Sequence, residues 1–233
     1  MVFALLVTHR ADLCRILYDE ALERGVTVRF GCPVQHVEFA GPTVQLSTGE
    51  AVSADLLLAT DGAQSICREA LLGHAEPPKS SGKLIYRVYI DIETVSRHPE
   101  VADLVHPPRI HIWLGPAAHV VCYGLKGVFN IVISQPDDDK DEKGLNFDVQ
   151  RGDLDELRQS FQTWEPRLQK LLELADSMLR WSLPSSRQIE SWVHPLGRFA
   201  LLGDAAHSTF PLMSASQPPI VEANNQMRNL TNK

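Results

Sequence analysis

Two short apolar runs, far apart in the chain, each end in a glycine and an aspartate. Residues 54–60 lead into Asp61-Gly62, and residues 198–203 lead into Asp204. A near-continuous apolar run of this length is typical of a strand buried on both faces of an α/β sheet. The pair therefore predicts an α/β layer that the chain builds, leaves and re-enters.

Between these two runs the pattern changes to that of an antiparallel sheet. Four segments rich in β-branched and aromatic residues are joined by short turns with glycine or proline. They are residues 84–92, 109–114, 119–125 and 128–133. We therefore expect an α/β fold with an inserted antiparallel-sheet domain, divided at residues 1–78, 79–193 and 194–233.

The remaining segments predict four helices and four further strands. Helical spacing of apolar residues and helix-start signals favour helices at residues 11–24, 64–72, 153–163 and 167–174. Strand-like runs occupy residues 26–30, 34–39, 43–47 and 187–192. Residues 137–143 are charged and predict a solvated loop.

Composition and charge exclude several classes of protein. A net charge of −7 leaves no basic face to neutralise phosphates, so nucleic-acid binding is not expected. No apolar run is long enough to span a bilayer and no basic leader opens the chain, which predicts a soluble, cytoplasmic protein. The four cysteines are scattered and the nine histidines lack ligand spacing, so no metal site is expected.

The first strand end carries residue types that a bound nucleotide needs. Gly62 allows close backbone approach, a helix start offers free N–H donors, and Arg68 adds positive charge. Asp61 is placed either to accept hydrogen bonds from sugar hydroxyls or to hold the turn. A tight strand-to-helix turn with a surface arginine is the alternative interpretation, and the residues leave both open.

The second strand end has a similar character. Gly203, Ala205 and Ala206 are small enough to let a ligand lie on the backbone, and an acidic residue at the carboxyl end of a buried strand suits a sugar hydroxyl. Asp204 is equally suited to N-cap a following helix. The two roles are compatible.

Five blocks of sequence together resemble the FAD-dependent aromatic monooxygenases, in particular the salicylate-hydroxylase-like branch common in fungal secondary metabolism. Their order and spacing agree with that family from residue 8 to residue 213. The blocks are His9-Arg10-Ala11-Asp12-Leu13, residues 59–68, Tyr86-Arg87, Tyr123-Gly124-Leu125 with Asn130-Ile131-Val132, and Gly203-Asp204-Ala205-Ala206-His207 with Pro211. The resemblance implies a Rossmann-like FAD/NAD(P)-binding domain with an inserted substrate domain.

The resemblance also implies roles for individual residues. It assigns FAD binding to Arg10, Asp61, Gly62, Arg68, Gly203, Asp204 and Pro211. Arg87 and Tyr123 would hold a phenolate substrate over the flavin, while NAD(P)H reduces the flavin. That last role is physically sensible, because a guanidinium and a phenol hydroxyl stabilise a phenolate, whose ring carbon is the better nucleophile. Taken singly, Arg87 and Tyr123 would be interpreted as a surface cation and a core aromatic.

The chain departs from the family pattern in two places. It contains no Gly-x-Gly-x-x-Gly turn to hold the pyrophosphate, nor the acidic residue that follows such a turn. Residues 213–219 replace an expected glycine-rich turn, and Pro218-Pro219 would disrupt the helix after it. We therefore expect an incomplete Rossmann-like domain without its N-terminal βαβ unit, in a chain truncated at both ends.

Two functional hypotheses follow. The first is a monooxygenase that hydroxylates a phenolic small molecule with FAD, NAD(P)H and O2 in secondary-metabolite biosynthesis. The second is a catalytically inactive homologue that binds an aromatic ligand through its sheet, or that pairs as a dimer or with a complementing chain. The missing glycine-rich turn favours the second for this polypeptide alone, whereas the resemblance favours the first.

Overall fold

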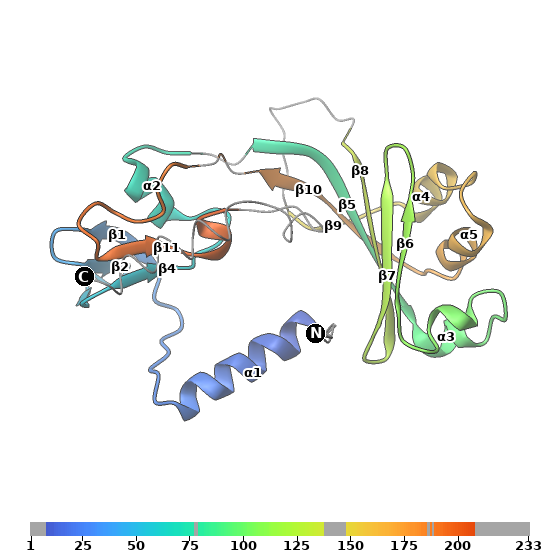
Figure 1. Cartoon of the computed structure of the whole chain (residues 1–233), viewed down its shortest axis with the longest axis horizontal. Helices are drawn as coiled ribbons and strands as arrows, with labels where there is room; N and C mark the ends of the chain where they lie inside the picture. The colour runs from blue at the N-terminus through green and yellow to red at the C-terminus, as the bar shows by residue number, and fades with distance from the viewer. Residues whose placement is uncertain (1–7, 77–78, 138–147, 186, 188, 208–233) are drawn as a thin grey trace, which may run out of the picture. The chain divides into compact units, whose positions relative to one another are not determined.

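The chain forms two units, each with its own core of buried apolar side chains. The computed structural model describes residues 8–76, 79–137, 148–185, 187 and 189–207 (Figure 1). Unit 1 takes residues 1–27 and 80–183, and unit 2 takes residues 28–79 and 184–233. The chain thus leaves unit 1, returns to it, and ends in unit 2.

Unit 1 is built on a six-stranded sheet in the order β6-β7-β8-β5-β10-β9. The strands are β5 (Lys79–Asp91), β6 (Ile110–Leu114), β7 (His119–Leu125), β8 (Val128–Pro136), β9 (Gln150–Arg151) and β10 (Met178–Ser185). The β6–β7, β7–β8, β5–β8 and β9–β10 pairs are antiparallel. The predicted antiparallel-sheet insertion is therefore confirmed.

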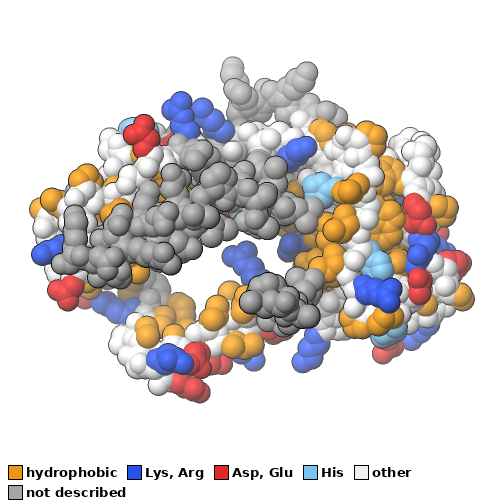
Figure 2. All heavy atoms as spheres, viewed as in Figure 1, with side chains coloured by type: hydrophobic (Ala, Val, Ile, Leu, Met, Phe, Trp, Pro, Cys, Tyr) orange, Lys and Arg blue, Asp and Glu red, His pale blue; other side chains and the backbone are white. Residues whose placement is uncertain are grey.

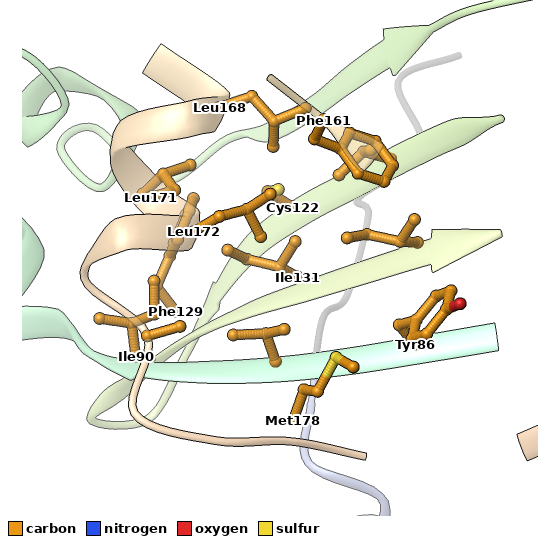
Figure 3. Packing of buried hydrophobic residues seen from close by; sticks show 14 of the residues in the cluster. Tyr86, Ile90, Cys122, Phe129, Ile131, Phe161, Leu168, Leu171, Leu172 and Met178 are labelled. Carbon is orange, nitrogen blue, oxygen red and sulfur yellow. The ribbon is translucent and has the colours of Figure 1, made fainter. Parts of the chain in front are cut away.

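Short helices cover one face of this sheet. They are α3 (Ile92–Ser96), the 3-10 helix η1 (Ala102–Leu104), α4 (Leu154–Ser160) and α5 (Pro166–Glu173). Proline at the first position starts α5, and the Glu165 carboxylate accepts a hydrogen bond from the N–H of Leu168 (3.3 Å). Apolar residues three and four positions apart on α5 then point into the core beside Cys122, Phe129 and Ile131 (Figure 3).

The helix α1 (Arg10–Glu23) forms where it was predicted, but it buries none of its residues. Its apolar side chains Leu13, Ile16, Leu17 and Leu22 are between 40% and 62% exposed. Figure 2 shows this apolar side as hydrophobic side chains along the helix. The helix thus forms where its sequence predicts it, although it has little tertiary packing among the described residues.

Unit 2 combines an antiparallel sheet, a parallel pair of strands and one helix. The antiparallel sheet is β1 (Val34–Glu38), β2 (Thr43–Leu46) and β3 (Ala51–Ser53), and the parallel pair is β4 (Leu57–Ala59) with β11 (Phe199–Leu201). The helix α2 (Ile66–Leu72) follows β4, and the 3-10 helix η3 (Gly203–Ala205) follows β11. The parallel pair in unit 2 and the antiparallel sheet in unit 1 confirm the predicted fold class.

Three local predictions are wrong. Residues 26–30 form no strand, and the described part of residues 187–192 contains none, with only an isolated bridge from Val193 to Ala200. A β-branched run becomes a strand only where a neighbouring backbone takes its hydrogen bonds, and none does here within the described residues. Nor is β4 buried on both faces, because Leu58 is 49% exposed.

Two further predictions lie where the structure cannot be compared with them. Most of the predicted loop at residues 137–143 and all of Pro211 fall outside the described residues.

The structure also contains a strand, β10, which the sequence did not predict. Its alternation ends in Pro184, which is uncommon inside a strand.

Candidate functional site: strand-end turns and a sheet face

The two predicted strand ends lie side by side in unit 2. In the parallel pair, Leu201 is opposite Ala59, and the N–H of Leu202 donates to the carbonyl of Ala59 (2.9 Å). The turns that follow, residues 60–62 and 203–206, therefore meet at the carboxyl edge of the same two strands. Ligands of α/β proteins bind at such edges.

Asp61 holds the first turn. Its carboxylate accepts hydrogen bonds from the hydroxyl of Ser65 (2.6 Å) and from the N–H of Cys67 (3.1 Å). Ser65 in turn caps α2 by accepting from the N–H of Arg68 (2.8 Å). Burial, with the Asp61 carboxylate second, raises the pKa of the Cys67 thiol to about 12, so this thiol stays neutral. Contact of Asp61 with FAD stays a prediction.

Arg68 ties the two turns together from inside the protein. Its side chain is 3% exposed, so the alternative of a surface arginine is wrong. The guanidinium pairs with the Glu76 carboxylate (2.7 Å) and donates to the carbonyls of Ala206 (2.8 Å) and Arg187. Because these contacts occupy the guanidinium, Arg68 acts here as an internal brace, and its contact with FAD stays a prediction.

The outer side of these turns has room for a ligand. Gly62 and Gly203 have positive φ angles of 82° and 58°, and a Cβ added at either would meet nothing within 4 Å. Asp204 lies in η3 and is exposed. Open backbone beside two glycines and an exposed carboxylate fit a nucleotide whose hydroxyls need acceptors. Arg10, exposed at the start of α1, belongs to unit 1.

The predicted substrate residues both lie in unit 1, on the sheet face that the helices leave free. Because side chains alternate along a strand, residues whose neighbours pack in the helix-covered core point to the opposite side. The register aligns them in three cross-strand rows. The rows are Tyr89–Asn130–Tyr123–Ile110, Arg87–Val132–Val121–Ile112 and Ile85–Ser134–His119–Leu114. We call this side of the sheet, which includes Trp181 beside Arg87, the second face.

The second face contains polar groups that have no partner. Within the part of the chain that the structure describes, the Nε atom of Arg87 and both polar atoms of the Asn130 amide are buried without a hydrogen bond. Asn130 is fully buried, whereas Ile112 and Leu114 at the edge are 52% and 79% exposed. Figure 2 shows hydrophobic side chains gathered over β6 and β7. Buried groups of this kind are rare in native proteins and indicate unused hydrogen-bonding capacity.

The charges on the second face are mainly positive. Register and alternation place Lys83, Arg87 and Arg151 there, together with the titratable ring of His119. Among the described strand residues on this face, the only acid is Asp91, which accepts from the N–H of Glu93 to cap α3 (2.7 Å). Burial, then the charge of Lys83, lowers the pKa of His119, which favours its neutral form. A cationic face on an acidic chain suits an anionic ligand.

Three residues of this face were not assigned to the site from sequence. Trp181 carries the guanidinium of Arg87, with the Arg87 Cζ 5.6 Å from the ring centroid. Asn130 was noted only as part of a matching block, and His119 only as one of the nine histidines that lack metal-ligand spacing. The signal that could have found them is the alternation of strands once their register is known.

The described residues contain neither a metal-ligand cluster nor a helix suited to cross a membrane. They contain no group of three or more His, Cys, Asp or Glu side chains arranged to hold a metal ion. Nor does a described helix combine the length and apolar character needed to cross a bilayer.

Comparison with known families decides which cofactor class this geometry belongs to. The profile of the family described as FAD dependent oxidoreductase matches residues 5–190. The chain belongs to this family. As an FAD dependent oxidoreductase, it is 34% identical over 212 residues to the FAD-dependent monooxygenase OpS4 of Beauveria bassiana, covering 88% of this chain and 48% of that protein.

Other relatives of this FAD dependent oxidoreductase point the same way. The 3-hydroxybenzoate 6-hydroxylase of Klebsiella oxytoca is 29% identical over 216 residues, covering 89% of this chain and 50% of that protein. A salicylate hydroxylase solved as a substrate complex superposes with a TM-score of 0.71 at 28% identity, over 87% of this chain and 52% of that one. The chain spans about half the length of the curated relatives it matches.

Proposed function

We propose that this chain takes part in the FAD-dependent hydroxylation of a phenolic small molecule, with NAD(P)H as reductant and O2 as oxygen source. The observation that carries the proposal is the second face of unit 1. There Arg87 and Tyr123 lie on neighbouring cross-strand rows, on a face with more cations than acids. The membership of the chain in the FAD dependent oxidoreductase family supports the same reaction class.

The bound flavin would supply the redox and oxygen chemistry, and this chain's residues would hold it and the substrate. The residues that would hold FAD are Arg10 and the strand-end residues Gly62, Gly203 and Asp204, with Asp61 and Arg68 keeping those turns in shape. Gly62 and Gly203 would let the nucleotide lie on the backbone, and Asp204 would accept hydrogen bonds from its hydroxyls. Pro211 keeps its proposed place near the flavin ring.

Arg87, Tyr123 and His119 would act on the phenol. The Arg87 guanidinium stabilises the ionised oxygen, and Tyr123 donates a second hydrogen bond to it. His119 is the group on this face whose ordinary pKa is nearest neutral pH, and its lowered pKa keeps it able to accept a proton. Ionisation enriches the ring carbons in electron density, which is what an electrophilic oxygen donor requires. The same assignment places the reaction in the cytoplasm, where NAD(P)H is available.

The test begins with the flavin content of the purified 233-residue chain, measured by absorbance before and after denaturing release. With flavin bound, hydroxylation of 3-hydroxybenzoate as the first probe is followed by NAD(P)H-dependent O2 uptake and product analysis. Arg87→Ala should lower kcat/KM about 100-fold, since it removes a charged donor from the developing anion. Tyr123→Phe should lower kcat/KM by about 10-fold for the loss of one hydrogen bond.

Matched controls lie on the helix-covered side of unit 1, one on β5 and one on α5. Tyr86→Phe removes a phenol hydroxyl that accepts from Gln135 (2.8 Å), and Arg167→Ala removes a guanidinium that pairs with Asp103. Both controls should leave turnover unchanged. Equal losses in controls and in second-face variants would contradict the assignment. A chain that binds no flavin would contradict the proposed activity for this polypeptide.

A further inference from the structure

We infer that Trp181 is a positioning residue that orients Arg87 for an anionic oxygen on the second face, without neutralising its charge. The inference rests on the proposed function, because it specifies how the same face distinguishes an ionised phenol from a neutral one. It concerns β10, one of the strands that the sequence did not predict. Trp181 itself would not contact the substrate.

The first step is the contact between neighbouring strands. β10 lies next to β5 in the sheet order, and the Cζ of Arg87 lies 5.6 Å from the ring centroid of Trp181. Within about 6 Å of a ring centroid, a guanidinium is attracted by the negative face of the aromatic ring, most strongly for tryptophan. Trp181 is therefore close enough to select one orientation of the Arg87 head group.

The second step is what Arg87 lacks. Among the described residues, no carboxylate forms an ion pair with Arg87, although most other arginines that make side-chain contacts have one. Its Nε atom is buried and without a hydrogen bond. An acidic partner would orient the guanidinium too, but it would also cancel the charge that an anionic ligand needs. An aromatic partner orients the group and leaves the charge in place.

The third step is geometric. Guanidinium N–H bonds lie in the plane of the group, so an aromatic ring attracts the charge without accepting one of these N–H bonds, which stay available to a ligand. A planar edge with two parallel donors matches oxygen anions better than a freely rotating cation does. Other residues of the second face would not neutralise Arg87 either. Lys83 and Arg151 are cations, and His119 favours its neutral form. The ligand chemistry that fits is an aromatic ring bearing an ionised oxygen.

The experiment measures the ionisation of a bound phenol directly. The probe is 4-nitrophenol, whose ionised and neutral forms absorb at different wavelengths, titrated with the full chain over a range of pH. In wild type, binding should lower the pKa of the probe, so that more of it is ionised when bound than when free. A purely structural role of Trp181 would not move this spectroscopic reading in a variant that stays folded.

Three variants test the role of Trp181. Trp181→Leu should weaken binding of 4-nitrophenolate by about tenfold and should abolish the pKa shift of the bound probe, since the aliphatic side chain has no π face. Trp181→Phe keeps an aromatic face and should retain affinity within about threefold of wild type. The matched control is Trp113→Leu on β6, where the indole N–H donates to Glu165 (3.0 Å) on the helix-covered side. It should not change the probe's pKa.

Each outcome of these measurements either supports or overturns the role of Trp181. If Trp181→Leu binds and ionises the probe as wild type does, the inference is overturned while the proposed function stands. If Trp181→Phe and Trp113→Leu lose as much as Trp181→Leu, Trp181 is a packing residue only and the inference is overturned. If the wild-type chain binds no 4-nitrophenolate at any pH, both the proposed function and the role of Trp181 are overturned. Urea unfolding of each variant shows that it is folded, and Trp181→Phe provides the reading if Trp181→Leu is not.

Discussion

The strand-end turns of unit 2 and the second face of unit 1 differ in how their buried arginines are paired, although Nδ1 of His207, just after the second turn, is also buried without a hydrogen bond among the described residues. In the turns, Ser65 and Arg68 are buried and have partners within the protein. On the second face, the Asn130 amide and the Nε of Arg87 are buried without partners. A buried group without a hydrogen bond costs stability, whereas a paired one fixes geometry. We therefore expect the turns to be rigid, and we propose that the second face receives a ligand.

The largest expected effect on stability comes from removing Arg68, which connects the two turns. Arg68→Ala leaves Glu76, whose side chain is 15% exposed, without its cation, and frees the carbonyls of Ala205 and Ala206. Removing one partner of a buried ion pair should lower the free energy of unfolding by about 3–5 kcal/mol. Urea denaturation followed by circular dichroism measures this.

The control for that change is Arg29→Ala, which removes an exposed pair with Glu50 in the same unit. Exposed pairs contribute little, so this variant should unfold almost as wild type does. Similar losses for Arg29→Ala and Arg68→Ala would show that the turns are not braced from inside.

A change of opposite sign is expected on the second face. Asn130→Leu replaces an amide that has no partner among the described residues with an apolar side chain of similar size, so it should raise the free energy of unfolding by about 1–3 kcal/mol.

In the turns, removing a polar group that has a partner should instead lower the free energy of unfolding. Ser65→Ala removes a helix cap and should lower stability by about 1 kcal/mol. If Asn130→Leu destabilised as Ser65→Ala does, the amide would have a partner and the contrast would disappear.

The smallest expected effect is a dependence on pH. Burial and Lys83 lower the pKa of His119 below its ordinary 6.5, so the unfolded chain holds this proton more tightly than the folded chain. The contribution is therefore complete above the ordinary pKa and is lost as pH falls through the lower, folded-state pKa. Urea midpoints should decline from about pH 7.5 to about pH 5.5, and His119→Gln should flatten this slope. An equal slope in the variant would assign the decline to other groups.

Local sequence was sufficient for the parts of the fold that local chemistry determines. Ser65 and Gly73 bound α2 because one caps its start and the other, with φ of 74°, ends it, and both types were readable in advance. The glycine and aspartate at each strand end likewise marked the turns. The β-branched and aromatic residues between two short turns predicted β7, residues 119–125, to the residue.

What the sequence could not predict depends on long-range pairing. Arg68 was interpreted as a cofactor cation or a surface residue, because its carbonyl partners lie 137 and 138 positions away. Trp181 reaches Arg87 only because β10 lies beside β5, a neighbour relation that no local pattern encodes. The strand predicted at residues 26–30 failed for the same reason, since pairing decides what an apolar run becomes.

The parallel pairing of β4 with β11 has a consequence for how the protein reaches its native state. The two strands lie about 140 residues apart in sequence, and residues 80–183 of unit 1 belong to the loop between them. Contacts of high contact order form slowly, because the entropy of closing the loop is lost before the pairing is gained. During synthesis, the chain can form most of the unit 1 sheet before β11, the partner strand of β4, has been made. We therefore expect the pairing of β4 with β11 to form after most of the unit 1 sheet, so that the turns proposed to hold FAD take their native form late in folding.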